Sequence, residues 1–161
     1  MNYILLLKAL YESQIKYLLC GGLAVNIYGV PRMTADIDIL LEWEESNVKN
    51  FIRVIDQLSY KKSASIDFST LVDAKIRENL IQSKNMIAFS FYNPSTSFMN
   101  LDVLINNPLP FHELWEQKVV RSAKDFSVYL ISPEHLILMK SNSEREQDKQ
   151  DIIQLRKIAI K

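Results

Sequence analysis

Cysteine, glycine and long apolar runs are all scarce in this chain of 161 residues. Cys20 is the single cysteine, so no disulfide can form within the chain, which is typical of a reducing compartment. The apolar run near the N-terminus stops at Lys8 and is too short for a signal peptide or a membrane span. We therefore expect a cytoplasmic protein that does not contact a membrane.

An excess of charge is also missing, because 19 Lys and Arg residues balance 19 Asp and Glu residues. Proteins that clamp duplex nucleic acid are usually strongly basic, so the neutral balance argues against that class. It does not exclude a nucleotide or a local RNA contact. Apolar residues make up 48% and charged residues 24%, which is ordinary for a globular protein. The length predicts one domain over residues 1–161, large enough to fold without a disulfide or a metal.

The spacing of apolar residues predicts a mixed α and β fold without repeats or linkers. Ser132 followed by Pro133 is a typical helix start, and Ser143 with Glu146 fits a capping box for the last helix. Helices are expected at residues 3–14, 23–28, 45–58, 70–83 and 111–119. Two more helices are expected, one that begins at residue 133 and a last one that runs from the capping box to residue 158. Strands are expected at residues 17–20, 37–41, 86–92, 98–105 and 127–131.

The three glycines lie within nine residues of one another, at Gly21, Gly22 and Gly29. Gly21 and Gly22 follow a predicted strand and precede a predicted helix. Backbone amides at such a turn can cradle phosphate oxygens. A plain turn is the more common meaning of two adjacent glycines, so this pair gains weight only from its position before the acidic strand.

Three aspartates are candidates for chemistry. Asp36 and Asp38 are two apart on a predicted strand and therefore share one face, while Ile37 and Ile39 enter the core on the other. Asp102 lies within a second apolar strand, where a carboxylate needs a partner. Together the three could hold divalent cations, which prefer oxygen ligands. Each could instead be a turn cap or an exposed acid at a sheet edge.

Charged residues elsewhere are weaker candidates. Arg32, between the glycine turn and the acidic strand, could pair with a phosphate or form a salt bridge with a nearby Asp. Lys140 could meet a triphosphate, and Asp148 and Asp151, which share a helix face, could orient it. A solvated helix with ion pairs explains the same spacing equally well.

The stretch GGLAVNIYGVPRMTADIDILL (Gly21–Leu41) resembles the signature of the DNA polymerase β-type nucleotidyltransferase superfamily. It is most similar to the small bacterial branch with the AbiEii-like toxin proteins and the lincosamide nucleotidyltransferases. Asp102 corresponds to the family's third acid. The segment Leu130–Ile152 is similar to the branch's Lys, Arg, Asp, Asp segment, matched by Lys140, Arg145, Asp148 and Asp151.

The resemblance implies a small mixed sheet flanked by helices, with the triphosphate of an NTP over the Gly21-Gly22 turn. Family members use two Mg²⁺ ions and move a nucleoside monophosphate onto an acceptor, releasing pyrophosphate. By position, Asp36 and Asp38 would bind the metals and triphosphate. Asp102 would bind metal and help deprotonate the acceptor, and Lys140 would neutralise phosphate charge. Many relatives have Ser where this chain has Gly22, and many AbiEii-like toxins carry a further helical domain for which 161 residues leave no room.

Three functions follow as hypotheses. The first is a metal-dependent nucleotidyltransferase acting on an antibiotic, an RNA end or a protein side chain, within a toxin–antitoxin pair or alone. The second is a catalytically weak NTP-binding or antitoxin-like module that keeps the fold and binds a partner protein. The third is a metal-dependent nuclease, which would not need the glycine turn.

Overall fold

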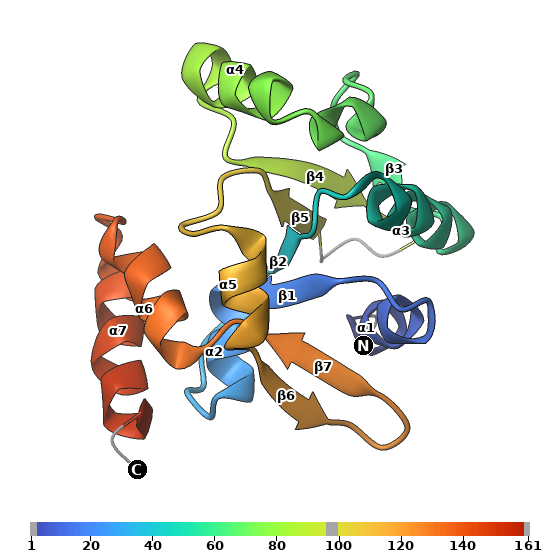
Figure 1. The fold of residues 1–161 in the computed structure, drawn as a ribbon. Helices are drawn as coiled ribbons and strands as arrows, with labels where there is room; N and C mark the ends of the chain where they lie inside the picture. Colours follow the sequence, from blue (N-terminus) through green and yellow to red (C-terminus); the bar gives the residue numbers. More distant parts are fainter. Residues whose placement is uncertain (1–2, 96–99, 160–161) are drawn as a thin grey trace.

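The computed structural model describes residues 3–95 and 100–159, and its centre is a seven-stranded mixed sheet in the order β3-β4-β5-β2-β1-β7-β6 (Figure 1). Two parallel pairings, β2 with β5 and β1 with β7, are combined with antiparallel pairings between the other neighbours. The strands are β1 (Tyr17–Cys20), β2 (Asp36–Leu41), β3 (Lys61–Lys62), β4 (Ala88–Tyr92), β5 (Asn100–Leu104), β6 (Val119–Ser122) and β7 (Ser127–Leu130).

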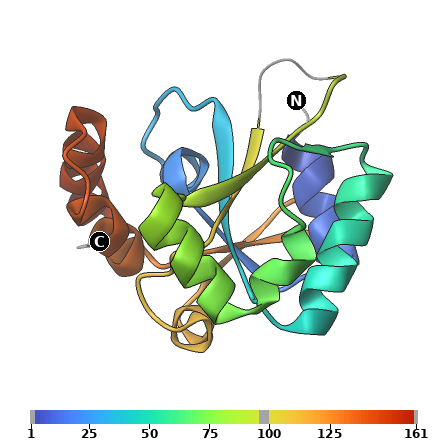
Figure 2. The same cartoon turned by 90° about the horizontal axis from the view of Figure 1, so that it is seen from above.

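Helices cover both sides of this sheet. In the two perpendicular views, α1 (Tyr3–Glu12) and α3 (Glu45–Gln57) lie on one side (Figures 1 and 2). The helices α2 (Gly21–Ile27), α6 (Pro133–Ser141) and α7 (Glu146–Ala159) lie on the other. The chain is therefore a mixed α/β domain, as the sequence predicts.

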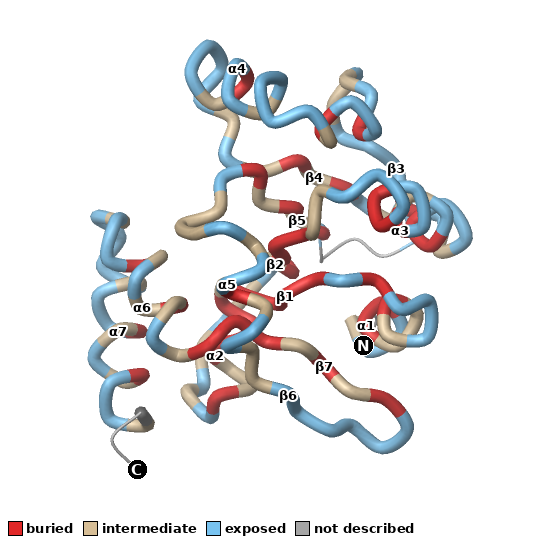
Figure 3. The backbone as a smooth tube through the Cα atoms, viewed as in Figure 1, coloured by how far each residue is buried: buried red, intermediate tan, exposed pale blue. Residues whose placement is uncertain are grey.

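Buried side chains are concentrated in the central strands and on the inner faces of the helices (Figure 3). In α3, Val48, Phe51 and Ile55 are buried because their spacing of three and four residues places them on one helix face. Phe51 contacts both Phe68 and Phe91, so aromatic packing extends from α3 across to β4. This core makes the sheet a rigid base for the polar groups on its other face.

Most helices begin and end within two residues of the prediction, and two predicted helices differ more. The predicted helix 70–83 is two elements, the 3₁₀ helix η1 (Phe68–Val72) and α4 (Ala74–Lys84). They are separated because the carboxylate of Asp73 accepts a hydrogen bond from the amide of Lys75, which caps α4 one turn into the predicted helix. The cap predicted at Ser132 is confirmed, since its side chain accepts from the amide of His135.

Two short strands at the sheet edges are missing from the prediction. The predicted helix 111–119 is shorter in the structure, where it is α5 (Phe111–Glu116), and the chain then continues into the edge strand β6. The other edge strand, β3, has only two residues, both lysines and both exposed. Neither strand has the buried alternating pattern that identifies a strand from sequence. The predicted strand 98–105 is β5, and residues 98 and 99 lie outside the described part of the chain. None of the described helices has the length and apolar character needed to cross a membrane.

Candidate active site

The three predicted aspartates come from neighbouring parallel strands. Asp38 of β2 is the direct register partner of Asp102 of β5, and Asp36 pairs with Asn100. Ile37 and Ile39 are fully buried, whereas the three aspartates are half-buried, so the acids occupy the face opposite the core. The prediction that Asp102 lies in a strand is confirmed, and the structure shows that this strand pairs directly with the acidic strand.

The glycine turn lies against Asp38. Gly21 has a φ of +62°, and a Cβ atom added there would come within 1.9 Å of Oδ2 of Asp38. A side chain at position 21 would force Asp38 to move, so glycine there lets the carboxylate approach bare backbone. The amide of Gly22 donates a hydrogen bond to the Asp38 carboxylate. The turn and the acidic strand, about fifteen residues apart in sequence, form one continuous surface.

Burial and mutual repulsion raise the pKa of two of these acids. Burial, the largest cause, and the negative charges of Asp102 and Asp36 together raise the pKa of Asp38 to about 6, although the Gly22 amide and Lys140 partly offset the rise. The pKa of Asp36 is also raised, first by burial and then by Asp102. Carboxylates held together against their repulsion are stabilised by a cation.

The chemistry of this cluster fits a hard divalent cation. Oδ1 of Asp102 is buried and has no hydrogen-bond partner among the described residues. An unpaired buried carboxylate oxygen is costly, and coordination by a cation would satisfy it. Within residues 3–95 and 100–159, no group of three or more His, Cys, Asp or Glu side chains is arranged so that it could hold a metal ion. The assignment of Asp36, Asp38 and Asp102 as metal ligands therefore stays a prediction.

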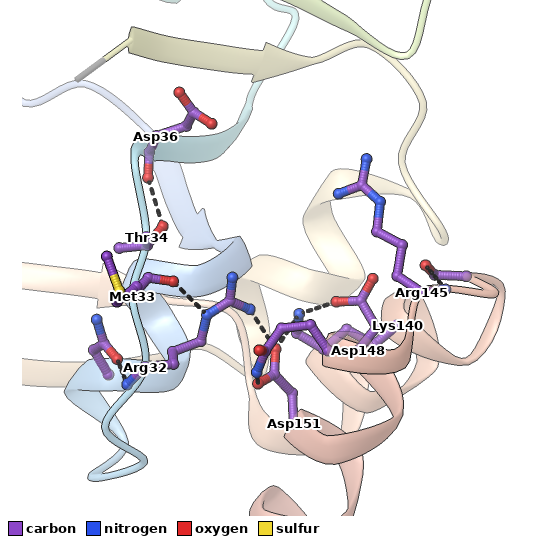
Figure 4. Close-up of polar contacts among 11 residues, drawn as sticks. Arg32, Met33, Thr34, Asp36, Lys140, Arg145, Asp148 and Asp151 are labelled. Carbon is purple, nitrogen blue, oxygen red and sulfur yellow. Dashed lines mark hydrogen bonds and ion pairs between the residues drawn. The ribbon is translucent and has the colours of Figure 1, made fainter. Parts of the chain in front are cut away.

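A buried ion network joins the segment before β2 to α6 and α7 (Figure 4). Asp151 is 1% exposed, and its Oδ2 lies 2.5 Å from Nη1 of Arg32 and 2.8 Å from Nζ of Lys140. Lys140 also contacts Asp148 at 2.5 Å, and Gln147 donates to the other oxygen of Asp151 at 3.0 Å. The salt-bridge alternative for Arg32 is thus what the structure contains, and both cations have an acidic partner.

Asp148 and Asp151 occupy different positions in this network. Burial alone would raise the pKa of Asp148, but hydrogen bonds from Lys140 and Ser143 lower it below its ordinary value. Asp148 lines a cavity, whereas Asp151 lies behind it and is not part of the lining. Asp151 can therefore hold Arg32 and Lys140 in place without touching a ligand.

The cavity has a volume of about 820 Å³ and includes all three aspartates, both glycines of the turn, Arg32, Lys140 and Asp148. Small-molecule sites usually have ~300–1,000 Å³. Arg145 also lines the cavity, and its guanidinium forms no hydrogen bond or ion pair with any described side chain. Exposed Met33 and Ile87 form part of the lining as well. The site therefore combines carboxylates, cations and apolar surface in a space sufficient for a nucleotide.

A known protein family matches residues 4–158 of this chain, and its description is "nucleotidyltransferase of unknown function (DUF6036)". The chain belongs to this nucleotidyltransferase family. Among curated proteins, no sequence is similar enough to match it.

Two solved structures show that this nucleotidyltransferase shares its fold with distant proteins. The lincomycin-bound lincosamide antibiotic adenylyltransferase LnuA superposes with a TM-score of 0.63 at 17% identity, over 98% of this chain and 96% of that one. An antigenic nucleotidyltransferase-like protein from Paracoccidioides brasiliensis gives a TM-score of 0.60 at 17% identity, over 96% of this chain and 74% of that one. The predicted DNA polymerase β-type nucleotidyltransferase fold is confirmed.

Several cavity residues of this family member were not predicted from its sequence. Thr34 is two residues before Asp36, and its position beside the acidic strand is a signal that could have identified it. Met33 is 95% exposed, and an exposed apolar side chain has no pattern that distinguishes it from a surface residue. Ile87 lies in the loop before β4 and reaches the site only because β4 pairs with β5.

Proposed function

We propose that this chain transfers a nucleoside monophosphate from an NTP to a hydroxyl group of an acceptor, with release of pyrophosphate. The observation that carries the proposal is the register pair Asp38 and Asp102, side by side on parallel strands at a cavity that begins at the Gly21-Gly22 turn. A nuclease would not require bare backbone against one of the acids, so the turn favours nucleotidyl transfer over hydrolysis.

Asp36, Asp38 and Asp102 would hold two Mg²⁺ ions, which supply charge stabilisation for phosphoryl displacement. The buried unpaired oxygen of Asp102 and the raised pKa values of Asp36 and Asp38 support this assignment. Mg²⁺ dependence follows from the chemistry of the donor set.

The protein's own side chains have three tasks in this proposal. Asp102 accepts the proton of the acceptor hydroxyl as that oxygen attacks the α-phosphorus. Lys140, Arg32 and Arg145 line the cavity on the α6–α7 side and face the negative charge of the triphosphate. In the ion network, Asp151 holds the side chains of Lys140 and Arg32 in position, and Asp148 also holds Lys140. The bond from the α-phosphorus to the pyrophosphate oxygen breaks, and pyrophosphate leaves.

The acceptor is proposed to be a hydroxyl compound that reaches Asp102 past the apolar lining at Ile87 and Leu104. The name of LnuA states that it acts on an antibiotic, which makes small hydroxyl compounds the first acceptors to test. An RNA end and a protein side chain are the other two acceptor classes to test. A toxin–antitoxin context and a cognate partner protein stay predictions, as does the cytoplasmic location.

The test incubates the protein with each α-labelled NTP and Mg²⁺, with lincosamides, RNA and a protein extract as separate acceptors. Asp38→Asn keeps the shape of the side chain but removes its charge, and Asp56→Asn, at an exposed position of α3, is the matched control. We expect label transfer by the unchanged protein and by Asp56→Asn, and none by Asp38→Asn. Equal transfer by Asp38→Asn, or no binding of any NTP, would contradict the proposal. Tight NTP binding without transfer to any acceptor would support the binding-module hypothesis instead.

A further inference from the structure

The space beside Gly22 is filled by two polar side chains from the segment before β2. A Cβ atom added at Gly22 would lie 2.7 Å from Oγ1 of Thr34 and 3.0 Å from Cζ of Arg32. Ordinary van der Waals contacts of a Cβ atom are 3.4–4 Å, so no side chain fits without displacing these groups. Residue 22 is therefore a glycine because Thr34 and Arg32 take the volume that its side chain would need.

The hydroxyl of Thr34 is placed to serve a ligand in the cavity. Thr34 is half-buried and lines the cavity, and its only hydrogen bond to a described residue is a donation to the backbone carbonyl of Asp36 at 3.2 Å (Figure 4). Hydroxyl hydrogen bonds are usually ~2.7–2.8 Å, so this one is long and weak. A hydroxyl hydrogen rotates freely about its C–O bond while the β-branched side chain stays fixed. Thr34 can therefore donate to a ligand without changing its rotamer.

A hydroxyl and a guanidinium that converge beside bare backbone make a directional donor set for an anion. Arg32 supplies charge at this point, and Thr34 supplies a hydrogen bond of fixed direction. In an inference that rests on the proposed function, we propose that Thr34 is a phosphate-positioning residue. Its Oγ1 donates to a phosphate oxygen of the NTP at the Gly21-Gly22 turn, in the place where a serine at position 22 would have presented its own hydroxyl.

The first experiment measures binding in the presence of Mg²⁺, with each of the four NTPs and with inorganic tripolyphosphate as probes. Thr34→Val removes the hydroxyl and keeps the shape, and Thr34→Ser restores the hydroxyl. Thr70→Val is the matched control, because the Thr70 hydroxyl also donates to a backbone carbonyl but lies outside the cavity. One hydrogen bond to a charged group corresponds to about a tenfold or greater change in affinity. We expect Thr34→Val to weaken both NTP and tripolyphosphate by about that factor, Thr34→Ser to recover most of the loss, and Thr70→Val to change neither.

The second experiment tests the geometry through stability, without any ligand. Gly22→Ser should lower the melting temperature, because its Cβ meets the Thr34 hydroxyl. Combining it with Thr34→Ala removes the closest contact, with Oγ1, and leaves those with Cβ of residue 34 and Cζ of Arg32 at 3.0 Å. The double variant should therefore be more stable than the sum of the two single effects. In the double variant the hydroxyl returns from position 22, and tripolyphosphate should bind more tightly than it does to Thr34→Ala alone.

The outcomes separate this inference from the proposed function. If the unchanged protein binds neither any NTP nor tripolyphosphate, the proposed function fails and this inference fails with it. If it binds them and Thr34→Val binds equally well, the role of Thr34 is wrong while the proposed function stands. Weakened NTP binding with unchanged tripolyphosphate binding would also overturn the inference, because the contact would then not be to phosphate. A Gly22→Ser variant as stable as the unchanged protein would show that Thr34 does not occupy the space beside residue 22.

Discussion

The charge of Asp38 should reduce the stability of the protein when no divalent cation is bound. The pKa of this acid rises from an ordinary 3.8 to about 6 in the folded protein. Each pKa unit corresponds to ~1.36 kcal/mol, so ionised Asp38 costs the folded state about 3 kcal/mol. A neutral residue of the same shape avoids this cost, and Asp38→Asn should therefore be more stable than the unchanged protein at about pH 7.5.

The sign of the pH dependence follows from the direction of the shift. Because the pKa of Asp38 is higher in the folded protein than in the unfolded chain, the folded protein holds this proton more tightly. The associated stability is fully present below about pH 4 and is lost as the pH rises through about 6. The advantage of Asp38→Asn should accordingly be near zero at about pH 4 and should reach about 3 kcal/mol above pH 7 or so.

Urea unfolding with EDTA, measured over this pH range for both proteins, checks the magnitude. Asp56→Asn, at an exposed position in α3, is the control and should show no such pH-dependent advantage. Repeating the series with Mg²⁺ should stabilise the unchanged protein more than Asp38→Asn, because the variant has lost a proposed ligand. An Asp38→Asn variant that is less stable than the unchanged protein, or whose advantage does not change with pH, would refute this reasoning.

Two further substitutions test the surroundings of the cluster. Asp151→Asn leaves buried Lys140 and half-buried Arg32 without their shared partner and should lower the free energy of unfolding by about 3 kcal/mol in urea titrations. Glu146→Gln, at an exposed position, should change it by less than about 0.5 kcal/mol, and equal losses would show that the network is not structural. Gly21→Ala should lower the melting temperature more than Gly29→Ala. Both glycines have a positive φ, but only a Cβ atom at position 21 would meet a side chain, that of Asp38. Calorimetry that finds Gly29→Ala to be the more destabilising change would contradict this contact.

The parts of the site that follow from strand geometry could be predicted from the sequence. Alternation along β2 placed Asp36 and Asp38 on one face, and the apolar neighbours of Asp102 placed it in a strand, whereas the pairing of that strand with β2 is known only from the structure. Both inferences use the two-residue period of a strand, which is independent of the rest of the fold. They also explain why the fold class was predicted correctly while the two short edge strands, which have no such pattern, were not.

The ion network could not be predicted in the same way. Arg32 and Asp151 are 119 residues apart in sequence, and their contact depends on how α7 packs, which local spacing does not determine. The burial of Asp151 is equally hidden, because its helix has charged and polar residues on several sides. From the sequence, Gly22 is only a departure from the Ser of many relatives, whereas the structure shows that neighbouring side chains occupy the volume beside it. The overlap of the Thr34 and Arg32 side chains with the space beside residue 22 is visible only in the three-dimensional structure.

The parallel pairing of β2 with β5 also protects the protein from a misaligned sheet. A shift of β5 by one residue would turn Asp102 into the apolar layer and would bring Leu101 and Val103 out of it, since every side chain would change face. The cost of placing a carboxylate in that layer makes the shifted pairing unfavourable. Asp102 therefore makes the shifted alignment much less stable than the correct one, and the gap between the two favours a single alignment of the strands.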